Sequence, residues 1–297
     1  MPRELDPTEV GVIGLGVMGG AIAANLLQAG FTVTGYDIAP ERLQEHATRG
    51  GLVASSCREV ASRASVVLTS LPSETALDQA VAGEEGLVHA CSDDLVVVEV
   101  STLPLEAKER ARQALARHGA TLLDCPLSGT GAQARVKDLV VLGSGDPEAL
   151  RRCAPVFDAF ARSWHDLGAF GSGSKLKYLA NLLVTIHNLA AAEALLLAKR
   201  AGLDPAAVLP VLADGAGTSR MLEVRGPAMV TGEYEPAAMR VELFQKDIDI
   251  IAAFARDCHA PTPLFSTSVP YYLAALAQGR GGQDTACLLA VLEAMTR

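Results

Sequence analysis

Short apolar runs alternate with helical patterns over the first half of the chain. The runs that predict strands are Val10–Gly14, Phe31–Asp37, Val66–Leu71, Leu95–Val100, Thr121–Asp124 and Leu139–Gly143. The segments with helical periodicity are Met18–Ala29, Glu41–Arg49, Arg58–Arg63, Thr75–Ala90 with a break near Gly83 and Gly86, Leu105–His118 and Asp146–Phe160. Leu95–Val100 is nearly all valine, as is typical of a strand buried on both faces. This alternation predicts an α/β protein with a parallel, doubly wound sheet.

The pattern changes after Gly168–Gly173, a run with three glycines. The next segment, Ser174–Ala201, predicts one helix of about 28 residues and about 40 Å. Further helices follow it, with no convincing strand, and we expect breaks at Gly202, Pro205, Gly215–Gly217, Gly226-Pro227, Pro236 and Pro261/Pro263. We therefore predict a sheet domain over residues 1–170 and an all-helical domain over residues 171–297.

A glycine-rich loop lies between the first predicted strand and helix. The residues Gly14-Leu15-Gly16-Val17-Met18-Gly19 fit G-x-G-x-x-G. In a dinucleotide-binding loop the first glycine permits the tight turn, the second lets the pyrophosphate approach the backbone, and the third lets helix and strand pack closely. The motif alone is weak, but its setting between strand and helix, with Asp37 ending the next strand, strengthens it. We predict a Rossmann-type domain that binds a nicotinamide dinucleotide.

Asp37 indicates which dinucleotide is bound. Its carboxylate would accept hydrogen bonds from the adenosine ribose hydroxyls, and it would repel a 2′-phosphate, so we predict NAD rather than NADP. Arg42 could neutralise such a phosphate, but we interpret it as a solvated helix residue.

A candidate acid/base lies at the start of the long helix, in the glycine-rich stretch Gly171–Asn181. Lys177 and Asn181 are four residues apart and share one helix face. Desolvation and the positive helix N-terminus both disfavour a charged lysine, so we expect the pKa of Lys177 to be lowered. An isolated K-x-x-x-N pair would instead be interpreted as solvated helix residues.

Four segments resemble the motifs of the β-hydroxyacid dehydrogenase family, and they occur in the family's order. They are Gly14–Gly19, the stretch Asp124-Cys125-Pro126-Leu127-Ser128-Gly129-Thr130-Gly131, Gly171–Asn181, and Lys246-Asp247-Ile248. The family includes 3-hydroxyisobutyrate dehydrogenase, tartronate semialdehyde reductase and glyoxylate/succinic semialdehyde reductase. The resemblance implies reversible oxidation of a small β-hydroxyacid, or reduction of the matching semialdehyde.

The resemblance also implies roles for residues around the substrate. Lys177 would be the general acid/base at the substrate oxygen, and Asn181 would hold the substrate. Ser128 and Gly129 would bind the substrate carboxylate, with Thr130 in the same substrate motif. The alternative for Ser128 is a plain turn residue.

For the cofactor, the resemblance places Lys246 over the nicotinamide end. Leu71-Pro72 and Thr102, at the ends of two parallel strands, match family positions that contact the dinucleotide. Ligands in open α/β sheets bind at the carboxyl ends of strands, which agrees with this assignment. The alternative for Thr102 is a helix N-cap.

Two residues depart from the family pattern. Thr130 replaces the second glycine after the serine, and its larger side chain would alter the substrate pocket. Lys137 stands where a glycine is usual, so we expect that turn to avoid a conformation that only glycine tolerates.

Two alternative functions remain. An imine reductase of the same fold usually replaces the catalytic lysine, so Lys177 disfavours it. A catalytically silent dinucleotide-binding protein is disfavoured because Lys177, Asn181 and Ser128 are all present.

Composition narrows the partners. With 25 basic and 34 acidic side chains the net charge is −9, which disfavours nucleic acid and anionic membranes as partners. The six cysteines form no C-x-x-C pair and the first residues do not resemble a signal peptide, so we expect a cytoplasmic protein with reduced thiols. The six histidines lack metal-ligand spacing, so no metal is expected. Cys125 lies near the predicted site and is interpreted as a packing residue.

The long helix carries two further expectations. Its apolar stretch Leu182–Ala198 is interrupted by polar residues, which favours a buried core helix over a membrane span. We also predict a homodimer or homotetramer. Ala190, Ala191, Ala194 and Ala198 would form an outer stripe for another helix, and the helical half would lack a complete core of its own.

Overall fold

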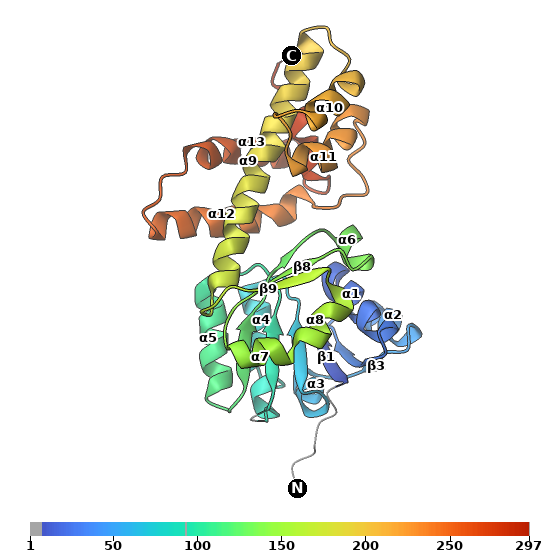
Figure 1. Cartoon of the computed structure of the whole chain (residues 1–297), viewed down its shortest axis with the longest axis vertical. Helices are drawn as coiled ribbons and strands as arrows, with labels where there is room; N and C mark the ends of the chain where they lie inside the picture. Colours follow the sequence, from blue (N-terminus) through green and yellow to red (C-terminus); the bar gives the residue numbers. More distant parts are fainter. Residues whose placement is uncertain (1–7, 93, 297) are drawn as a thin grey trace. The chain divides into compact units, whose positions relative to one another are not determined.

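The computed structural model describes residues 8–92 and 94–296. The chain divides into two compact units, one ending at Lys177 and one beginning at Tyr178. The division falls within the long helix α9 (Ser172–Arg200), which continues from the first unit into the second (Figure 1).

Six parallel strands form the main sheet of the first unit, in the order β3-β2-β1-β4-β5-β6. Their bounds are β1 (Glu9–Ile13), β2 (Thr32–Tyr36), β3 (Leu52–Val53), β4 (Val66–Thr69), β5 (Val96–Glu99) and β6 (Thr121–Asp124). The predicted doubly wound parallel sheet is confirmed. The strand order reverses between β1 and β4, and ligands of such sheets bind at the carboxyl ends of the strands beside that reversal.

Helices cover both faces of this sheet. They are α1 (Val17–Gln28), α2 (Pro40–Thr48), α3 (Cys57–Arg63), α4 (Glu74–Ala82), α5 (Leu105–Ala116), α6 (Gly131–Arg135), α7 (Pro147–Arg152) and α8 (Ala154–Phe160), with the 3-10 turn η1 (Leu87–His89). Successive strand side chains point to opposite faces. Val96 and Val98 therefore join the core under α1 and α8, whereas Val97 joins the core under α3, α4 and α5. Burial on both faces explains the nearly all-valine strand.

A second, three-stranded sheet corrects one expectation. The strands are β7 (Leu127–Ser128), β8 (Val140–Gly143) and β9 (Ser163–Asp166), in the order β7-β8-β9, with β7 and β8 antiparallel. Leu139–Gly143, which we predicted as a further strand of the parallel sheet, therefore belongs to this small sheet. The helix predicted over Asp146–Phe160 is two helices, because Pro155 lacks the N–H that would continue the first.

The second unit is built from helices, and no described residue in it belongs to a strand of either sheet. After α9 come α10 (Pro205–Asp214), α11 (Arg220–Thr231), α12 (Val241–Asp257), α13 (Pro263–Ala277), the 3-10 turn η2 (Thr285–Cys287) and α14 (Leu288–Ala294). Gly226-Pro227 lies inside α11 and does not divide two helices. Tyr178, Phe244, Ile248 and Tyr272 belong to one buried cluster, so the expectation that this half lacks its own core is wrong.

Polar residues of α9 are bonded within that core. Asn188 donates to the Thr285 carbonyl at 2.8 Å, and the Tyr272 hydroxyl donates to the Thr185 carbonyl at 3.0 Å. By length and composition alone α9 could cross a bilayer, and 39% of its most apolar window is buried within the protein. The hydrogen bonds to η2 and α13 agree with the predicted core helix.

Candidate active site

The glycine-rich loop connects β1 to α1 at the reversal point of the sheet. A Cβ on Gly14 would lie 2.2 Å from the Ser70 carbonyl oxygen, and one on Gly19 would lie 1.8 Å from the Gly14 carbonyl oxygen. Neither position has room for a side chain. At Gly16, by contrast, a Cβ would meet no described atom within 4 Å. The space beside Gly16 is open, as the approach of a pyrophosphate requires.

The N-terminus of α1 completes this cradle. Its N-cap is Gly16, which provides no side-chain hydrogen bond, and its first turn carries no acidic side chain. The N–H groups and partial positive charge of the helix end therefore remain available to an anion. Val17 is 60% exposed at the same place. These residues fit a dinucleotide pyrophosphate.

Asp37 follows β2 and is held by two backbone groups. Its Oδ2 accepts a hydrogen bond from Leu15 N at 2.7 Å, and its Oδ1 accepts one from Ala39 N at 2.9 Å. Leu15 contributes this backbone group while its side chain is buried in the core. The next residue, Ile38, is 90% exposed. Arg42 pairs with Glu45 at 3.3 Å and is partly exposed, as expected of a solvated helix residue.

The other predicted cofactor residues follow β4 and β5. Leu71 lies beside the glycine-rich loop, since its Cδ2 would be 3.3 Å from a Cβ on Gly14. Its backbone N–H donates to Ser101 Oγ at 2.8 Å, which joins the ends of β4 and β5. Thr102 is half-buried, and the N-cap of α5 is Pro104, so the N-cap alternative for Thr102 is wrong.

The substrate motif turns sharply after β7. Ser128 is half-buried, and Gly129 has φ 138°, a conformation that favours glycine. A Cβ on Gly129 would also lie 2.6 Å from Leu139 Cδ2. Thr130 caps α6 through a capping box, in which Gln133 Oε1 accepts from Thr130 N at 3.0 Å. The structure thus gives Thr130 a capping role, and its contact with substrate stays a prediction.

Lys137 corrects an expectation. We expected its turn to avoid a conformation suited to glycine, but Lys137 has φ 59°, in the left-handed region. The residue lies just past the end of α6, where a left-handed residue commonly ends a helix. Asp138 N donates to the Gln133 carbonyl at 2.9 Å and so holds this turn. A non-glycine residue there costs roughly 1–2 kcal/mol.

The first turn of α9 is anchored on the end of β6. Ser174 N donates to Asp124 Oδ2 at 2.8 Å, and Ser174 Oγ donates to Asp124 Oδ1 at 2.7 Å. Gly173 N donates to Ser144 Oγ at 3.0 Å. Lys177, one turn further along the helix, is half-buried. Asp124 begins the substrate motif, and its carboxylate also holds the start of α9, the helix that carries Lys177.

In the second unit, Asn181 is buried and bonded to a residue that we did not predict. Its Nδ2 donates to Asp247 Oδ2 at 2.8 Å, and Lys246 Nζ lies 3.7 Å from Asp247 Oδ1. The bond directs the amide nitrogen of Asn181 toward Asp247. Asp247 belongs to the Lys246-Asp247-Ile248 motif, but the family resemblance gave a role only to the lysine of that motif.

Burial explains the chemistry of Cys125. The thiol is fully buried, and desolvation raises its pKa well above the ordinary value, with the charge of Asp124 as the next cause. A thiol in this state is not a nucleophile at neutral pH, which agrees with its interpretation as a packing residue.

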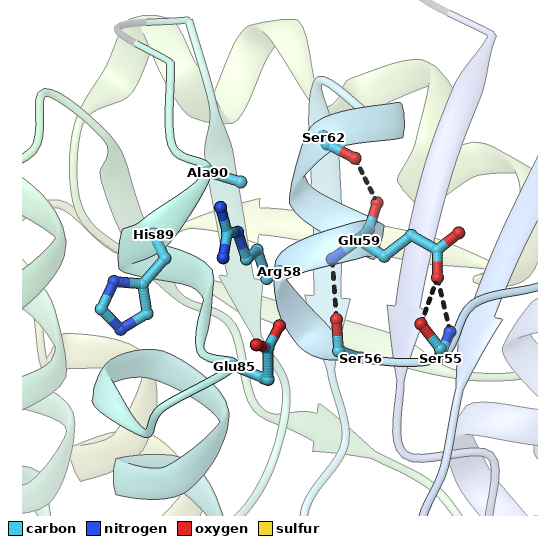
Figure 2. A pocket seen from close by; sticks show the side chains of 8 residues that line it. All are labelled: Ser55, Ser56, Arg58, Glu59, Ser62, Glu85, His89 and Ala90. Atoms are coloured by element: carbon cyan, nitrogen blue, oxygen red, sulfur yellow. Dashed lines mark hydrogen bonds between the residues drawn. The ribbon is translucent and has the colours of Figure 1, made fainter.

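A polar surface hollow lies over α3 and η1, and none of the predicted site residues lines it (Figure 2). Part of its lining is the N-terminal cap of α3. Ser56 Oγ accepts from Glu59 N at 3.1 Å, and Ser55 Oγ donates to Glu59 Oε2 at 2.6 Å. Hydrogen bonds from Ser55 lower the pKa of Glu59. Among the described residues, no group of three or more His, Cys, Asp or Glu is placed to hold a metal ion.

A doubly wound sheet with an open glycine cradle at its reversal point is typical of a dinucleotide-binding protein. The model for the NAD-binding domain of 6-phosphogluconate dehydrogenase matches residues 9–169. The model described as the NAD-binding domain of NADP-dependent 3-hydroxyisobutyrate dehydrogenase matches residues 171–292.

Curated relatives and solved structures agree. The chain is 36% identical over 283 residues to L-threonate dehydrogenase of Cupriavidus necator, covering 95% of each chain. It is 32% identical over 263 residues to 3-hydroxyisobutyrate dehydrogenase of Pseudomonas aeruginosa, covering 86% of this chain and 88% of that protein. A 3-hydroxyisobutyrate dehydrogenase structure from Salmonella typhimurium superposes with a TM-score of 0.85 at 30% identity, covering 95% of this chain and 99% of that one.

The chain therefore belongs to the β-hydroxyacid dehydrogenase family, and it is an oxidoreductase that transfers a hydride between a nicotinamide cofactor and a small β-hydroxyacid or semialdehyde. An imine reductase from Pseudomonas sp. is similar at 21% identity with a TM-score of 0.60, a likeness of fold alone.

Proposed function

We propose that Lys177 is the acid/base of an NAD-dependent dehydrogenase whose substrate is a small polyhydroxylated carboxylic acid. The observation that carries the proposal is the anchoring of the first turn of α9 on Asp124. The helix start that carries Lys177 is thereby tied to the motif that contains Ser128. A general acid/base must be held within hydrogen-bond reach of the proton that it transfers, and such anchoring supplies that constraint.

Lys177 would act on the substrate hydroxyl. In the oxidative direction its neutral amine takes the hydroxyl proton, and in the reductive direction its ammonium returns a proton to the carbonyl oxygen. The nicotinamide, when bound, accepts or gives the hydride at its C4. A proton and a hydride thus leave the same alcohol group, so that atoms and charges balance.

Ser128 and Gly129 would bind the substrate carboxylate. Ser128 offers a hydroxyl donor, and the turn at Gly129 offers a backbone N–H beside it. Asn181 would contribute its amide oxygen or its second N–H to a substrate hydroxyl, because one N–H already donates to Asp247. This orientation refines the sequence-based interpretation, which gave Asn181 no particular atom.

NAD is the proposed cofactor, with Asp37 as the discriminating residue. Its carboxylate follows β2, where the adenosine ribose of a bound dinucleotide would lie. Leu71, Pro72, Thr102 and Lys246 complete the proposed cofactor contacts. A 2′-phosphate would meet the negative charge of Asp37.

L-threonate is the first substrate to test, because the relative from Cupriavidus necator carries that activity in its name. A panel of L-threonate, 3-hydroxyisobutyrate, glycerate and 4-hydroxybutyrate, each with NAD and with NADP, identifies the acid and the cofactor. Turnover of simple imines without turnover of any hydroxyacid would favour the imine reductase alternative.

The decisive variant is Lys177→Ala, with Lys175→Ala as the matched control. Lys175 lies on the same helix two residues earlier and is exposed. We expect Lys177→Ala to lower kcat by about 10²-fold or more while the NAD dissociation constant stays nearly unchanged. Lys175→Ala should keep kcat within about twofold. Similar kcat values for the two variants would refute the role of Lys177.

We further propose that the protein is a cytoplasmic homodimer or homotetramer. The predicted alanine stripe is wrong in part, because Ala191 and Ala198 are buried in the core of the second unit. The exposed apolar face of α9 keeps Ala190 and Ala194 of that stripe and adds Leu183, 51% exposed, and Leu197, 71% exposed. The spacing of these four residues places them on one helix face. A second copy of the chain is the proposed partner for this face.

A further inference from the structure

A buried lysine outside the proposed chemistry lies beside β5 and β6 of the first unit. Lys108 is on α5, and its side chain, like those of Glu99 and Asp124, is 0% exposed. Its Nζ lies 2.6 Å from Glu99 Oε2 and 2.7 Å from Asp124 Oδ1, and it donates to the Ser101 carbonyl at 2.8 Å. The ammonium thus donates hydrogen bonds to the Asp124 carboxylate and the Ser101 carbonyl, and it forms an ion pair with Glu99.

The ammonium is kept charged by its neighbours. Burial by itself lowers the pKa of Lys108, but the attraction of Asp124 and Glu99 and their hydrogen bonds together raise it above the ordinary value. One positive and two negative groups leave a buried net charge of −1. Such a cluster contributes little to stability, because desolvation of the charges offsets their attraction. The hydrogen bonds of the cluster are directional, so they constrain where the bonded groups lie.

Through Asp124, the cluster holds the start of α9, the helix that carries Lys177. Lys108 holds Asp124 Oδ1, and the same carboxylate accepts both Ser174 N at 2.8 Å and Ser174 Oγ at 2.7 Å. Asp124 Oδ2 also accepts from Ser144 Oγ at 3.1 Å, and Ser144 in turn accepts from Gly173 N. The first turn of α9 is therefore fixed through a carboxylate that Lys108 orients.

Through Glu99, the cluster is also bonded to the loops that we propose bind the cofactor. Glu99 Oε1 accepts from Ser101 N at 2.9 Å, and Ser101 Oγ accepts from Leu71 N at 2.8 Å. Thr102 follows directly in the chain. Lys108 therefore lies between the elements proposed to hold the cofactor and the element proposed to carry the acid/base.

We propose that Lys108 is a positioning residue for the dehydrogenase reaction, which sets the place of Lys177 through Asp124 and Ser174. This inference rests on the proposed role of Lys177. Lys108 takes no part in proton or hydride transfer. Its effect is on kcat, because a displacement of about 1 Å at a reacting group can cost about 10²-fold in rate.

The test must separate positioning from charge balance. Lys108→Met alone leaves two buried carboxylates without a counter-charge, which destabilises the fold. The double variant Glu99→Gln/Lys108→Met restores a net charge of −1, and the glutamine keeps an oxygen for Ser101 N. We expect this double variant to be more stable than Lys108→Met yet to have a kcat about 10-fold to 10²-fold below wild type. Its NAD dissociation constant by calorimetry should change by less than about threefold.

A measurement without turnover keeps the two proposals distinguishable. Hydrogen–deuterium exchange of the peptide over Gly171–Lys177 should be faster in the double variant than in wild type. Ser268→Ala is the control, because it also removes the hydroxyl bond of a buried serine, to the Leu264 carbonyl, but in the second unit. Unchanged exchange, or wild-type kcat in a folded double variant, would overturn the positioning role whatever Lys177 does. If Lys177→Ala stays active while exchange is faster, the proposed function fails and the structural link stands.

Ser174→Ala covers the case in which neither Lys108 variant folds. It removes the Oγ bond to Asp124 without changing any charge. We expect kcat to fall by about threefold to tenfold, the loss that one buried hydrogen bond represents. Wild-type kcat together with wild-type exchange in Ser174→Ala would contradict the proposal.

Discussion

Gly173→Ala is a sharp test of how closely α9 must lie against the strands of the first unit. A Cβ on Gly173 would lie 2.2 Å from the Leu142 carbonyl oxygen and 2.8 Å from the Asp124 carbonyl oxygen. Ordinary contact begins at 3.4 Å, so the shortfall at Leu142 is 3.4 − 2.2 = 1.2 Å. The Asp124 oxygen accepts a bond from Ser144 N at 2.8 Å and belongs to paired backbone. The first turn of α9 must therefore give way, by about 1 Å.

We expect Gly173→Ala to lower the free energy of unfolding slightly and kcat strongly. Alanine favours a helix over glycine by about 1 kcal/mol, whereas overpacking costs about 1–3 kcal/mol, so the net loss of unfolding free energy is about 0–2 kcal/mol. The rate should suffer more, because a shift of about 1 Å in the helix of Lys177 can lower kcat by about 10²-fold. We expect a folded enzyme with a slightly lower Tm and a strongly reduced kcat.

Steady-state kinetics and thermal unfolding of Gly173→Ala check this expectation. Gly217→Ala is the matched control, since a Cβ there meets no described atom within 4 Å. The control should keep both Tm and kcat. A Gly173→Ala enzyme with kcat within about threefold of wild type would show that the anchoring of α9 does not set the rate.

Three further predictions concern the cofactor, pH and assembly. Asp37→Asn, which keeps an acceptor for Leu15 N, should raise the kcat/KM ratio of NADP to NAD by about tenfold, equivalent to roughly 1.4 kcal/mol, and an unchanged ratio would remove Asp37 as the discriminator. Burial lowers the pKa of His46. As the pH falls below about 6.5, the unfolded chain therefore binds a proton more readily than the folded chain. The free energy of unfolding then decreases by up to about 1.4 kcal/mol per pH unit. Denaturant unfolding between pH 7.5 and 5.5 should show a smaller loss in His46→Leu, and equal slopes would contradict this. Leu197→Glu should lower the mass by sedimentation equilibrium, whereas a fully active wild-type monomer would refute the oligomer.

Local sequence patterns determined the framework of this protein. The consecutive valines of β5 indicate that both faces of the strand are buried. The glycine loop with Asp37 indicates a dinucleotide site, because these signals lie within one strand–turn–helix unit and the strand after it. The spacing of Lys177 and Asn181 follows from helix periodicity alone. Each of these inferences needs contacts only between residues close in the chain.

Tertiary structure decided which distant residues support that framework. Nothing local to Lys108 distinguishes it from the solvated lysines of other helices, and its burial depends on β5 and β6 lying side by side under α5. The bond of Asn181 to Asp247 likewise joins α9 to α12, and the bond of Ser174 to Asp124 joins α9 to β6 across 50 positions of sequence. Even the turn at Lys137 was set by its surroundings, since the end of α6 imposes a left-handed conformation that lysine by itself disfavours. Sequence periodicity specifies which face of an element is buried, but the partner that meets a buried polar group is fixed only when the sheet order brings the two together.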